Sequence, residues 1–240
     1  GETHDSEADH AAQLEIVTAL HGDDPKLAIG MEMFQRPFQA ALDAYLAGEI
    51  DEAELRDRTE YEERWGFPWE YYAPLLRFAR DRSLPVLALN APAEATRKVS
   101  RGGLAKLTAA EQRHLPSLEE IDTSNRLHRD WVRDIFAQHD FTPDEETFER
   151  FYAAQVLWDE TMADTVARFV REQPNYRVVV IAGQGHTIYG YGIPSRVARR
   201  LSDRATLEQR SVIFSEEATE DLTAELQTEP PIADYIWIHP

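Results

Sequence analysis

Short apolar runs recur along the chain, and each of them ends at a polar or glycine-containing segment. A continuous apolar run of about four to eight residues is typical of a strand that is buried on both faces of a sheet. Such runs predict strands at residues 27–33, 84–89, 177–182 and 211–214, with a fifth at residues 235–238. We therefore expect a sheet at the centre of the molecule.

Between these runs, apolar residues recur three and four positions apart, which is the spacing along one face of an α-helix. This spacing predicts helices at residues 8–21, 37–46, 51–64, 69–82, 126–138, 144–172 and 197–201, and Pro194 suits the start of the last one. The acidic stretch 216–231 is expected to form a surface or mobile segment. Alternating strands and helices predict an α/β fold, with a mainly parallel sheet flanked by helices on both faces.

The length of the chain bounds its domain organisation. A chain of 240 residues fits one large domain, so we expect a single domain over residues 1–240. Gly1 stands in the middle of what looks like a motif that follows a strand. We therefore expect the first strand of the sheet, and any targeting segment ahead of it, to be missing or truncated.

Charge and cysteine content exclude several classes of partner and site. The chain has 44 acidic and 25 basic residues, a net charge of −19. Such a surface repels phosphate backbones, so no nucleic-acid partner is expected. The lack of cysteine excludes disulfides, thiolate catalysis, iron–sulfur clusters and covalent c-type haem attachment. No apolar run approaches the ~20 residues that a membrane span needs.

Polar side chains stand where the predicted strands end. Glu2 and His4 would follow the missing strand, Glu32 closes the second, Asn90 the third, and His186 follows the fourth. Ligands of open α/β sheets bind at the carboxyl ends of the strands. We therefore expect these side chains to line one polar pocket.

Two predicted helices carry polar residues within an apolar stripe. His10 and Gln13 start the stripe of the first helix, and Gln155 and Asp159 interrupt the stripe of the long helix. A carboxylate on an apolar face costs several kcal/mol unless it is paired or binds a metal. We therefore expect the pocket to supply partners for these residues.

Each of these residues also has a purely structural interpretation. Glu2 and His4 could cap the first helix, because acids favour helix N-termini. His186 could be a turn residue of its glycine-rich loop, and Asp159 could pair with an arginine. Glu32 is harder to explain structurally, because glutamate is rare in an apolar core.

The motifs around these residues, taken in order, form a set that extends over nearly the whole chain. They are Gly1-Glu2-Thr3-His4, His10 with Gln13, Gly30-Met31-Glu32-Met33-Phe34, Gln39, Trp69 with Tyr72, Leu89-Asn90-Ala91-Pro92, Arg101-Gly102-Gly103-Leu104, Gln155 with Asp159 and Met162, residues 183–186, and Gly192-Ile193-Pro194. This set resembles the ChaN-like haem-binding uptake family. That family is similar to the erythromycin esterases and the Tiki metalloproteases, which share a Gly-x-x-His motif, here Gly1 and His4, and glutamates at strand ends, here Glu2 and Glu32.

The resemblance implies an iron-linked lipoprotein of the cell envelope that binds haem through a tyrosine, with a histidine from a dimer partner. It therefore implies haem as cofactor, a homodimer, and membrane attachment only through a segment ahead of Gly1. We place the tyrosine at Tyr72; the other candidates are Tyr61, Tyr71, Tyr152, Tyr189 and Tyr191. The same motifs place Arg101 in the pocket with His10, Gln13, Asn90, Gln155 and Asp159.

Three hypotheses for function remain open. The leading one is a haem- or iron-binding protein of an iron-uptake system. The alternative is a divalent-metal-dependent hydrolase with Glu2, His4, Glu32 and His186 as metal ligands, and with Glu2 or Glu32 as catalytic base. The third is a polar core that keeps the superfamily's geometry without its activity.

Overall fold

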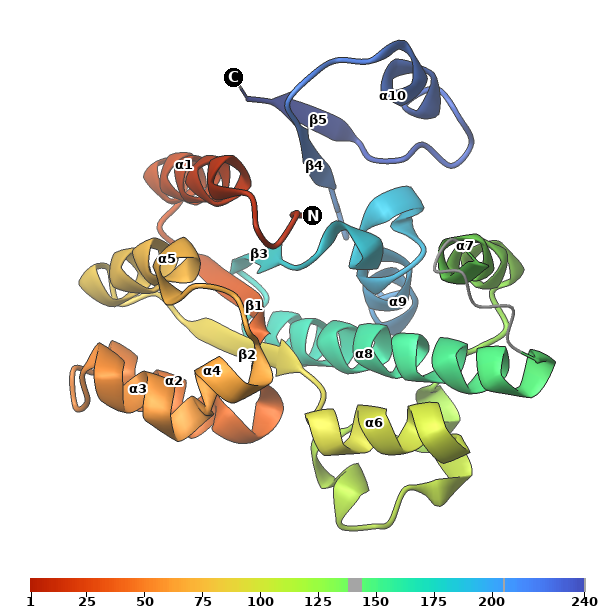
Figure 1. The fold of residues 1–240 in the computed structure, drawn as a ribbon. Helices are drawn as coiled ribbons and strands as arrows, with labels where there is room; N and C mark the ends of the chain where they lie inside the picture. Colours follow the sequence, from red (N-terminus) through yellow and green to blue (C-terminus); the bar gives the residue numbers. More distant parts are fainter. Residues whose placement is uncertain (138–143, 205, 240) are drawn as a thin grey trace.

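Three parallel strands form the central sheet of the computed structural model, which describes residues 1–137, 144–204 and 206–239. The strands are β1 (Leu27–Gln35), β2 (Val86–Asn90) and β3 (Arg177–Ile181), in the order β2-β1-β3 (Figure 1). All nine residues of β1 are buried, since this strand lies between its two neighbours and is covered on both faces. The predicted α/β class with a parallel sheet is confirmed.

Two further strands form a separate parallel pair at one end of the molecule (Figure 1). They are β4 (Val212–Ser215) and β5 (Tyr235–Ile238). The first residues of the chain lie between this pair and the central sheet. Glu2 forms a parallel bridge with Gly183, just after β3, while the ammonium group of Gly1 donates to the carbonyl of Val212 in β4 (2.8 Å). The motif at the start of the chain thus reaches the carboxyl end of the central sheet.

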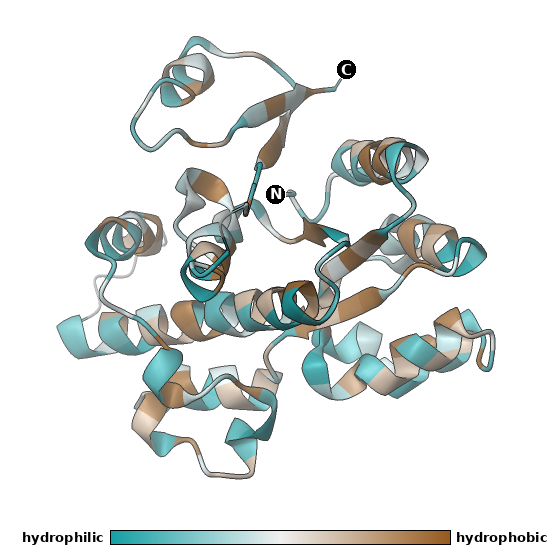
Figure 2. Cartoon of the chain, turned by 180° about the vertical axis from the view of Figure 1, so that it is seen from behind, coloured by the Kyte–Doolittle hydropathy of each residue, from teal (hydrophilic) through white to brown (hydrophobic). Residues whose placement is uncertain are grey.

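Helices cover both faces of the central sheet. The helices are α1 (Glu7–Asp23), α2 (Gln39–Leu46), α3 (Glu52–Thr59), α4 (Tyr61–Arg64), α5 (Trp69–Asp81), α6 (Ala93–Gly102), α7 (Arg126–Ala137), α8 (Glu145–Glu172), α9 (Ile193–Arg200) and α10 (Glu220–Glu225). One core, which includes Ile29 and Met31 of β1, packs against α1, α2 and α5. Another, which includes Leu87 and Leu89 of β2, packs against α8 and α9. Figure 2 shows these central strands largely in the hydrophobic colour, with hydrophilic residues on the outer helices.

Three helical segments differ from the sequence prediction. The predicted helix 51–64 is two helices, because Glu60 adopts a left-handed conformation (φ 50°) that ends α3 before α4 begins. Helices α6 and α10 were not predicted, and α10 lies in the acidic stretch 216–231. Gln138, the last residue of the predicted helix 126–138, lies outside the described residues.

Within the described ranges, no helix combines the length and the apolar content that crossing a membrane requires.

The prediction of a single domain over residues 1–240 stays a prediction.

Candidate functional site

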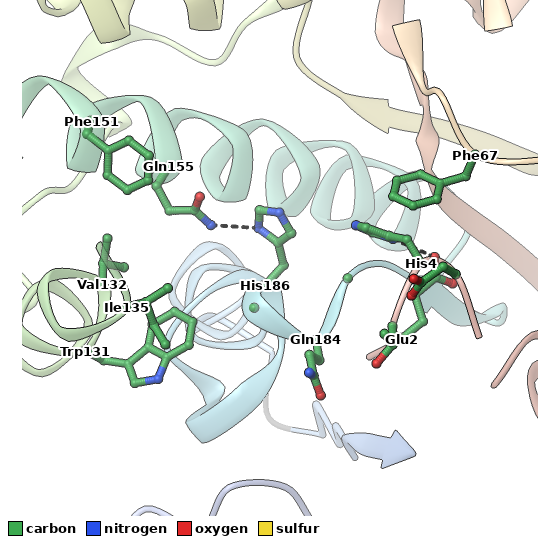
Figure 3. A pocket seen from close by; sticks show the side chains of 14 residues that line it. Glu2, His4, Phe67, Trp131, Val132, Ile135, Phe151, Gln155, Gln184 and His186 are labelled. Atoms are coloured by element: carbon green, nitrogen blue, oxygen red, sulfur yellow. Dashed lines mark hydrogen bonds and ion pairs between the residues drawn. The ribbon is translucent and has the colours of Figure 1, made fainter. Parts of the chain in front are cut away.

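A cavity of about 450 Å³ lies at the carboxyl end of the central sheet, between α7, α8 and the loop that follows β3 (Figure 3). Its lining residues are Glu2, Thr3, His4, Asp5, Phe67, Trp131, Val132, Ile135, Phe151, Gln155 and residues 183–186. The side chains from α7 are apolar, whereas the start of the chain and the loop bring carboxylate, imidazole and amide groups. The cavity therefore has an apolar wall facing a polar one.

Glu2 is the centre of the first polar cluster. Its carboxylate is buried and accepts hydrogen bonds from the Tyr72 hydroxyl (2.7 Å), the Gln13 amide (2.6 Å) and His4 Nδ1 (2.9 Å). Burial would lower the pKa of His4, but the bond to Glu2 and the nearby Glu32 carboxylate outweigh it and raise this pKa above its usual value. Three donors therefore fix the Glu2 carboxylate, which in turn fixes the ring of His4.

His10 supports this cluster from behind. Its Nε2–H donates to the backbone carbonyl of His4 (3.1 Å), and its Nδ1 lies 3.2 Å from the amide oxygen of Gln13. The ring stacks on Tyr71, with centroids 4.9 Å apart. The apolar stripe of α1 thus begins with a polar turn that faces the Glu2 cluster.

His186 is the centre of the second polar cluster. Its Nδ1–H donates to Asp159 Oδ1 (2.6 Å), and its Nε2 lies 3.4 Å from Glu32 Oε1. Burial would lower the pKa of His186, but the two carboxylates outweigh this effect and raise the pKa to about 10. Burial would raise the pKa of Glu32, but His186 and the backbone N–H of Gly183 (2.8 Å) together lower it. The pair is therefore charged at neutral pH.

The long helix α8 supplies two partners to His186. Asp159 is fully buried, and the Gln155 amide nitrogen lies 3.2 Å from His186 Nδ1 (Figure 3). Both residues interrupt the apolar stripe of the helix, and both face His186. Asp159 accepts the proton of Nδ1 and is thus paired, whereas the Gln155 amide contacts the ring without sharing that hydrogen bond.

Two glycines let the loop after β3 approach its neighbours closely. A Cβ on Gly183 would lie 2.8 Å from His4 Cε1, and a Cβ on Gly192 would lie 2.3 Å from the carbonyl oxygen of His186. Any larger residue would therefore displace the two histidines of the site.

Sequence reasoning did not identify His128 or the apolar side chains that α7 contributes to the cavity. His128 in α7 is fully buried, with Nε2 3.7 Å from Asp159 Oδ2, and burial lowers its pKa to about 4. Trp131 and Ile135 on the same helix line the cavity. The available signal was that His128 and Val132 are four residues apart and therefore share one helical face.

Six of the predicted pocket residues do not line the cavity. His10, Gln13, Glu32 and Asp159 lie behind the lining as partners of Glu2, His4 or His186, whereas Asn90 and Arg101 take no part in the two polar clusters.

Asn90 ends β2 at the expected edge of the sheet, but its side-chain oxygen turns back and accepts from the backbone N–H of Ala91 (2.8 Å). Arg101 is exposed in the last turn of α6, a helix that packs against α8. The structure therefore places Arg101 outside the pocket, with its side chain in solvent, although Leu104 of the same motif packs against the core beside α8.

The four predicted metal ligands do not form one ligand set. Glu2 pairs with His4, and Glu32 pairs separately with His186. In the part of the chain that the structure describes, no group of three or more His, Asp or Glu side chains is arranged to hold a metal ion. The hydrolase hypothesis is therefore not favoured over haem binding.

No tyrosine lines the cavity among the described residues. Tyr72 is fully buried behind Glu2, and burial together with the neighbouring carboxylate raises the pKa of its hydroxyl. A phenolate at Tyr72 is thus disfavoured in this conformation. Haem ligation by Tyr72 stays a prediction of the resemblance.

Comparison with protein families decides the classification. The family model described as "Haem-binding uptake, Tiki superfamily, ChaN" matches residues 1–197. The chain belongs to the ChaN family. Every residue that lines the cavity lies within the matched range. The ChaN match thus includes the whole candidate site and confirms the resemblance that the motifs indicated.

One solved structure has a similar fold. The structure described as "Cofacial heme binding to ChaN of Campylobacter jejuni" has a TM-score of 0.74 at 20% identity, over 100% of this ChaN-family chain and 86% of that chain. A mutant of erythromycin esterase EreC in its open conformation has a TM-score of 0.46 at 14% identity, over 85% and 66% of the two chains, and is too distant to support an argument.

A curated plant protein is also similar to this ChaN-family chain. Protein RETICULATA-RELATED 5, chloroplastic, of Arabidopsis thaliana is 25% identical over 247 residues, which cover 95% of this chain and 32% of that protein. The chain therefore spans about a third of the length of this curated relative.

Proposed function

We propose that this protein binds haem in the cavity between α7 and the loop after β3. The observation that supports this most directly is the pairing of an apolar wall with an imidazole that faces it. Phe67, Trp131, Val132, Ile135 and Phe151 offer apolar surface to a flat ligand, and His4 stands on the polar side. A volume of about 450 Å³ lies within the ~300–1,000 Å³ typical of pockets for small ligands and cofactors.

The donor chemistry of the cavity fits haem better than it fits a divalent ion. A porphyrin needs apolar contact over most of its surface and one or two axial donors, and imidazole is a common axial donor. Bound in this cavity, haem would supply an iron centre that His4 can reach. No arginine or lysine is among the described residues of the lining. The propionate groups are therefore expected at the mouth of the cavity, in water.

The family context supports the same proposal. The family is described as haem-binding, and the similar structure from Campylobacter jejuni is described as binding haem. We extend the proposal to a role in iron uptake at the cell envelope, with haem as the ligand carried.

A homodimer is part of the same proposal, and sedimentation velocity with and without haem would test it.

Titration of the purified protein with ferric haem tests the proposed function. We expect a saturable change of the Soret band, and Ile135→Asp should weaken binding about tenfold or more. A carboxylate that is desolvated against an apolar ligand costs at least about 1.4 kcal/mol, which corresponds to that factor.

Leu127→Asp is the matched control, because Leu127 lies on the same helix, is 58% exposed and does not line the cavity. It adds the same charge and should leave binding unchanged. A Soret change that never saturates, or equal losses in both variants, would contradict haem binding at this site.

A further inference from the structure

We infer that the outer edge of β5 binds a partner protein by accepting, as a third strand, an extended segment that is apolar in its middle and basic at its ends. The inference concerns the strand pair β4 and β5, which lies outside the range 1–197 that the family model matches. It is independent of the proposed haem site, so the failure of one leaves the other standing.

The strand pair is an unusual arrangement at the surface of a protein. Parallel strands are normally covered on both faces, and a stable sheet needs three or more strands or a helix that packs against it. This pair has two strands, and in the part of the chain that the structure describes only β4 makes extensive contact with β5. Figure 2 shows both strands partly in the hydrophobic colour, away from the central sheet. The edge of β5 that faces away from β4 is therefore uncovered.

The hydrogen bonds between the two strands show which backbone groups of β5 point outward. Tyr235 N–H donates to the carbonyl of Ser211 (3.0 Å), and His239 N–H donates to the carbonyl of the last residue of β4 (3.1 Å). In a parallel pair, alternate residues of a strand bond to its neighbour, so the N–H and C=O groups of Ile236 and Ile238 point away from β4. These two residues offer backbone donors and acceptors to a third strand.

The edge carries no residue that prevents pairing with another strand. Natural edge strands are kept short, or are protected by lysine, proline or a bulge. β5 is short, but it consists of apolar residues with a regular register against β4, and Tyr235 is 57% and Ile238 45% exposed. Exposed apolar side chains beside free backbone groups are the features that strand addition uses, since the backbone bonds give affinity and the side chains give specificity.

The charge around the edge determines which kind of segment fits. Residues 211–240 contain no lysine or arginine and seven carboxylates, those of Glu216, Glu217, Glu220, Asp221, Glu225, Glu229 and Asp234. A second copy of the chain would bring the same carboxylates to the edge, and like charges across an interface disfavour binding. Lysine or arginine on both sides of an apolar segment is attracted instead. The occupant is therefore a basic segment of another protein.

A synthetic peptide that alternates valine and threonine, with lysines at both ends, is the probe that tests the inference. We expect saturable binding that weakens as salt is added, because salt screens the attraction between charges. Hydrogen exchange at the amides of Ile236 and Ile238 should become slower in the complex, because both amides gain a partner. The same peptide with glutamates at both ends is the charge control and should bind at least about tenfold more weakly.

Ile238→Pro tests whether the peptide pairs with this edge. The substitution removes an outward N–H and leaves the bonds to β4 in place, because proline is tolerated where the N–H of an edge strand faces solvent. It should weaken binding of the lysine-flanked peptide about tenfold, which is the upper end of what one hydrogen bond contributes. Ile238→Val keeps the N–H and is the matched control. Slow exchange at the amide of Tyr235 shows that the strand pair is intact in either variant.

Two kinds of result would overturn the inference. If the lysine-flanked peptide does not bind, or binds without slowing exchange at Ile236, the edge of β5 is not its docking site. The same holds if Ile238→Pro binds the peptide as tightly as Ile238→Val does. If the chain self-associates and Ile238→Pro abolishes the association, a second copy covers the edge and the assignment to a basic partner is wrong.

Discussion

Glu32 and His186 form the ion pair on which the polar wall depends. The pKa of His186 is raised from 6.5 to about 10, so the pair stabilises the folded state fully below pH ~6.5, and this stabilisation is lost as the pH rises through about 10. The pKa of Glu32 is lowered, so its own contribution is present above its usual value of 4.5 and is lost in acid.

We therefore expect the free energy of unfolding of the haem-free protein to fall between pH 6.5 and 10. His186→Gln should remove most of this fall, because it removes the titrating group. The pKa itself is measurable from the ring proton resonances of His186. A titration midpoint near 6.5 would show that the two carboxylates do not hold the imidazole as described.

A substitution at Tyr72 distinguishes a structural role of this tyrosine from a role as iron ligand. Its hydroxyl donates to the buried carboxylate of Glu2, so Tyr72→Phe should cost about 1–3 kcal/mol of unfolding free energy. For a domain of this size, each kcal/mol lowers Tm by about 2–4 °C. The haem spectrum should stay unchanged, because the hydroxyl does not reach the cavity. A shifted spectrum at an unchanged Tm would identify Tyr72 as the ligand.

At the scale of single residues, the sequence identified those polar side chains that stand in apolar surroundings. Glu32 on a strand and Asp159 on an apolar helix face had to find partners, and they meet at His186. The motifs placed Tyr72 and Arg101 at the site, but local sequence did not show that Tyr72 is buried behind Glu2 or that Arg101 is exposed to solvent. Only the packing of α5 and α6 decides where these side chains lie.

At the scale of elements, the residue that follows the last strand forms a hydrogen bond with the first helix. His239, just after β5, is buried and donates through Nε2 to Asp9 Oδ1 (2.8 Å), while Asp9 Oδ2 accepts from the backbone N–H of Thr3 (2.9 Å). Thr3 lies between the two residues of the first polar cluster, Glu2 and His4. The carboxyl-terminal pair of strands therefore supports the motif at the start of the chain.

His239→Ala should destabilise the segment at the start of the chain that contains Glu2, Thr3 and His4. We expect a loss of about 0.5–1.5 kcal/mol in unfolding free energy, because Asp9 Oδ1 loses one of two hydrogen bonds and keeps the one from Ser6 Oγ (2.7 Å). Hydrogen exchange at the amide of Thr3 should become faster. Tyr235→Ala is the matched control, since Tyr235 lies on β5, the strand that precedes His239, and is 57% exposed. Unchanged exchange at Thr3 in the first variant would show that the contact supports nothing in the site.

The sequence predicted the five strands and most helices, because their periodicity is local. It missed the break between α3 and α4, which depends on the left-handed conformation of Glu60, a residue type without a strong turn preference. It also missed the apolar wall, since α7 reaches the carboxyl end of the sheet only through the tertiary fold. Contacts between segments far apart in the sequence, and not the local hydrophobic pattern, determine which side chains form that side of the cavity.

At the scale of the whole molecule, the net charge of −19 opposes the approach of haem, whose two propionates are anionic. Raising the ionic strength from ~0.01 M to ~0.15 M shortens the Debye length from ~30 Å to ~8 Å. Haem affinity should therefore rise severalfold with salt. Haem dimethyl ester, in which the propionates are neutral, is the control and should show a much weaker dependence. An affinity for haem that falls with salt would indicate a basic contact that the described cavity lacks.

The central claim is that haem occupies the cavity at the carboxyl end of the sheet, and the position of the iron tests it most directly. Crystals of the haem complex, measured at the iron absorption edge, locate the metal by its anomalous scattering. We predict one iron per chain, between the apolar wall of α7 and the ring of His4. Iron found only outside the cavity, or at a surface tyrosine with the cavity empty, would contradict the claim.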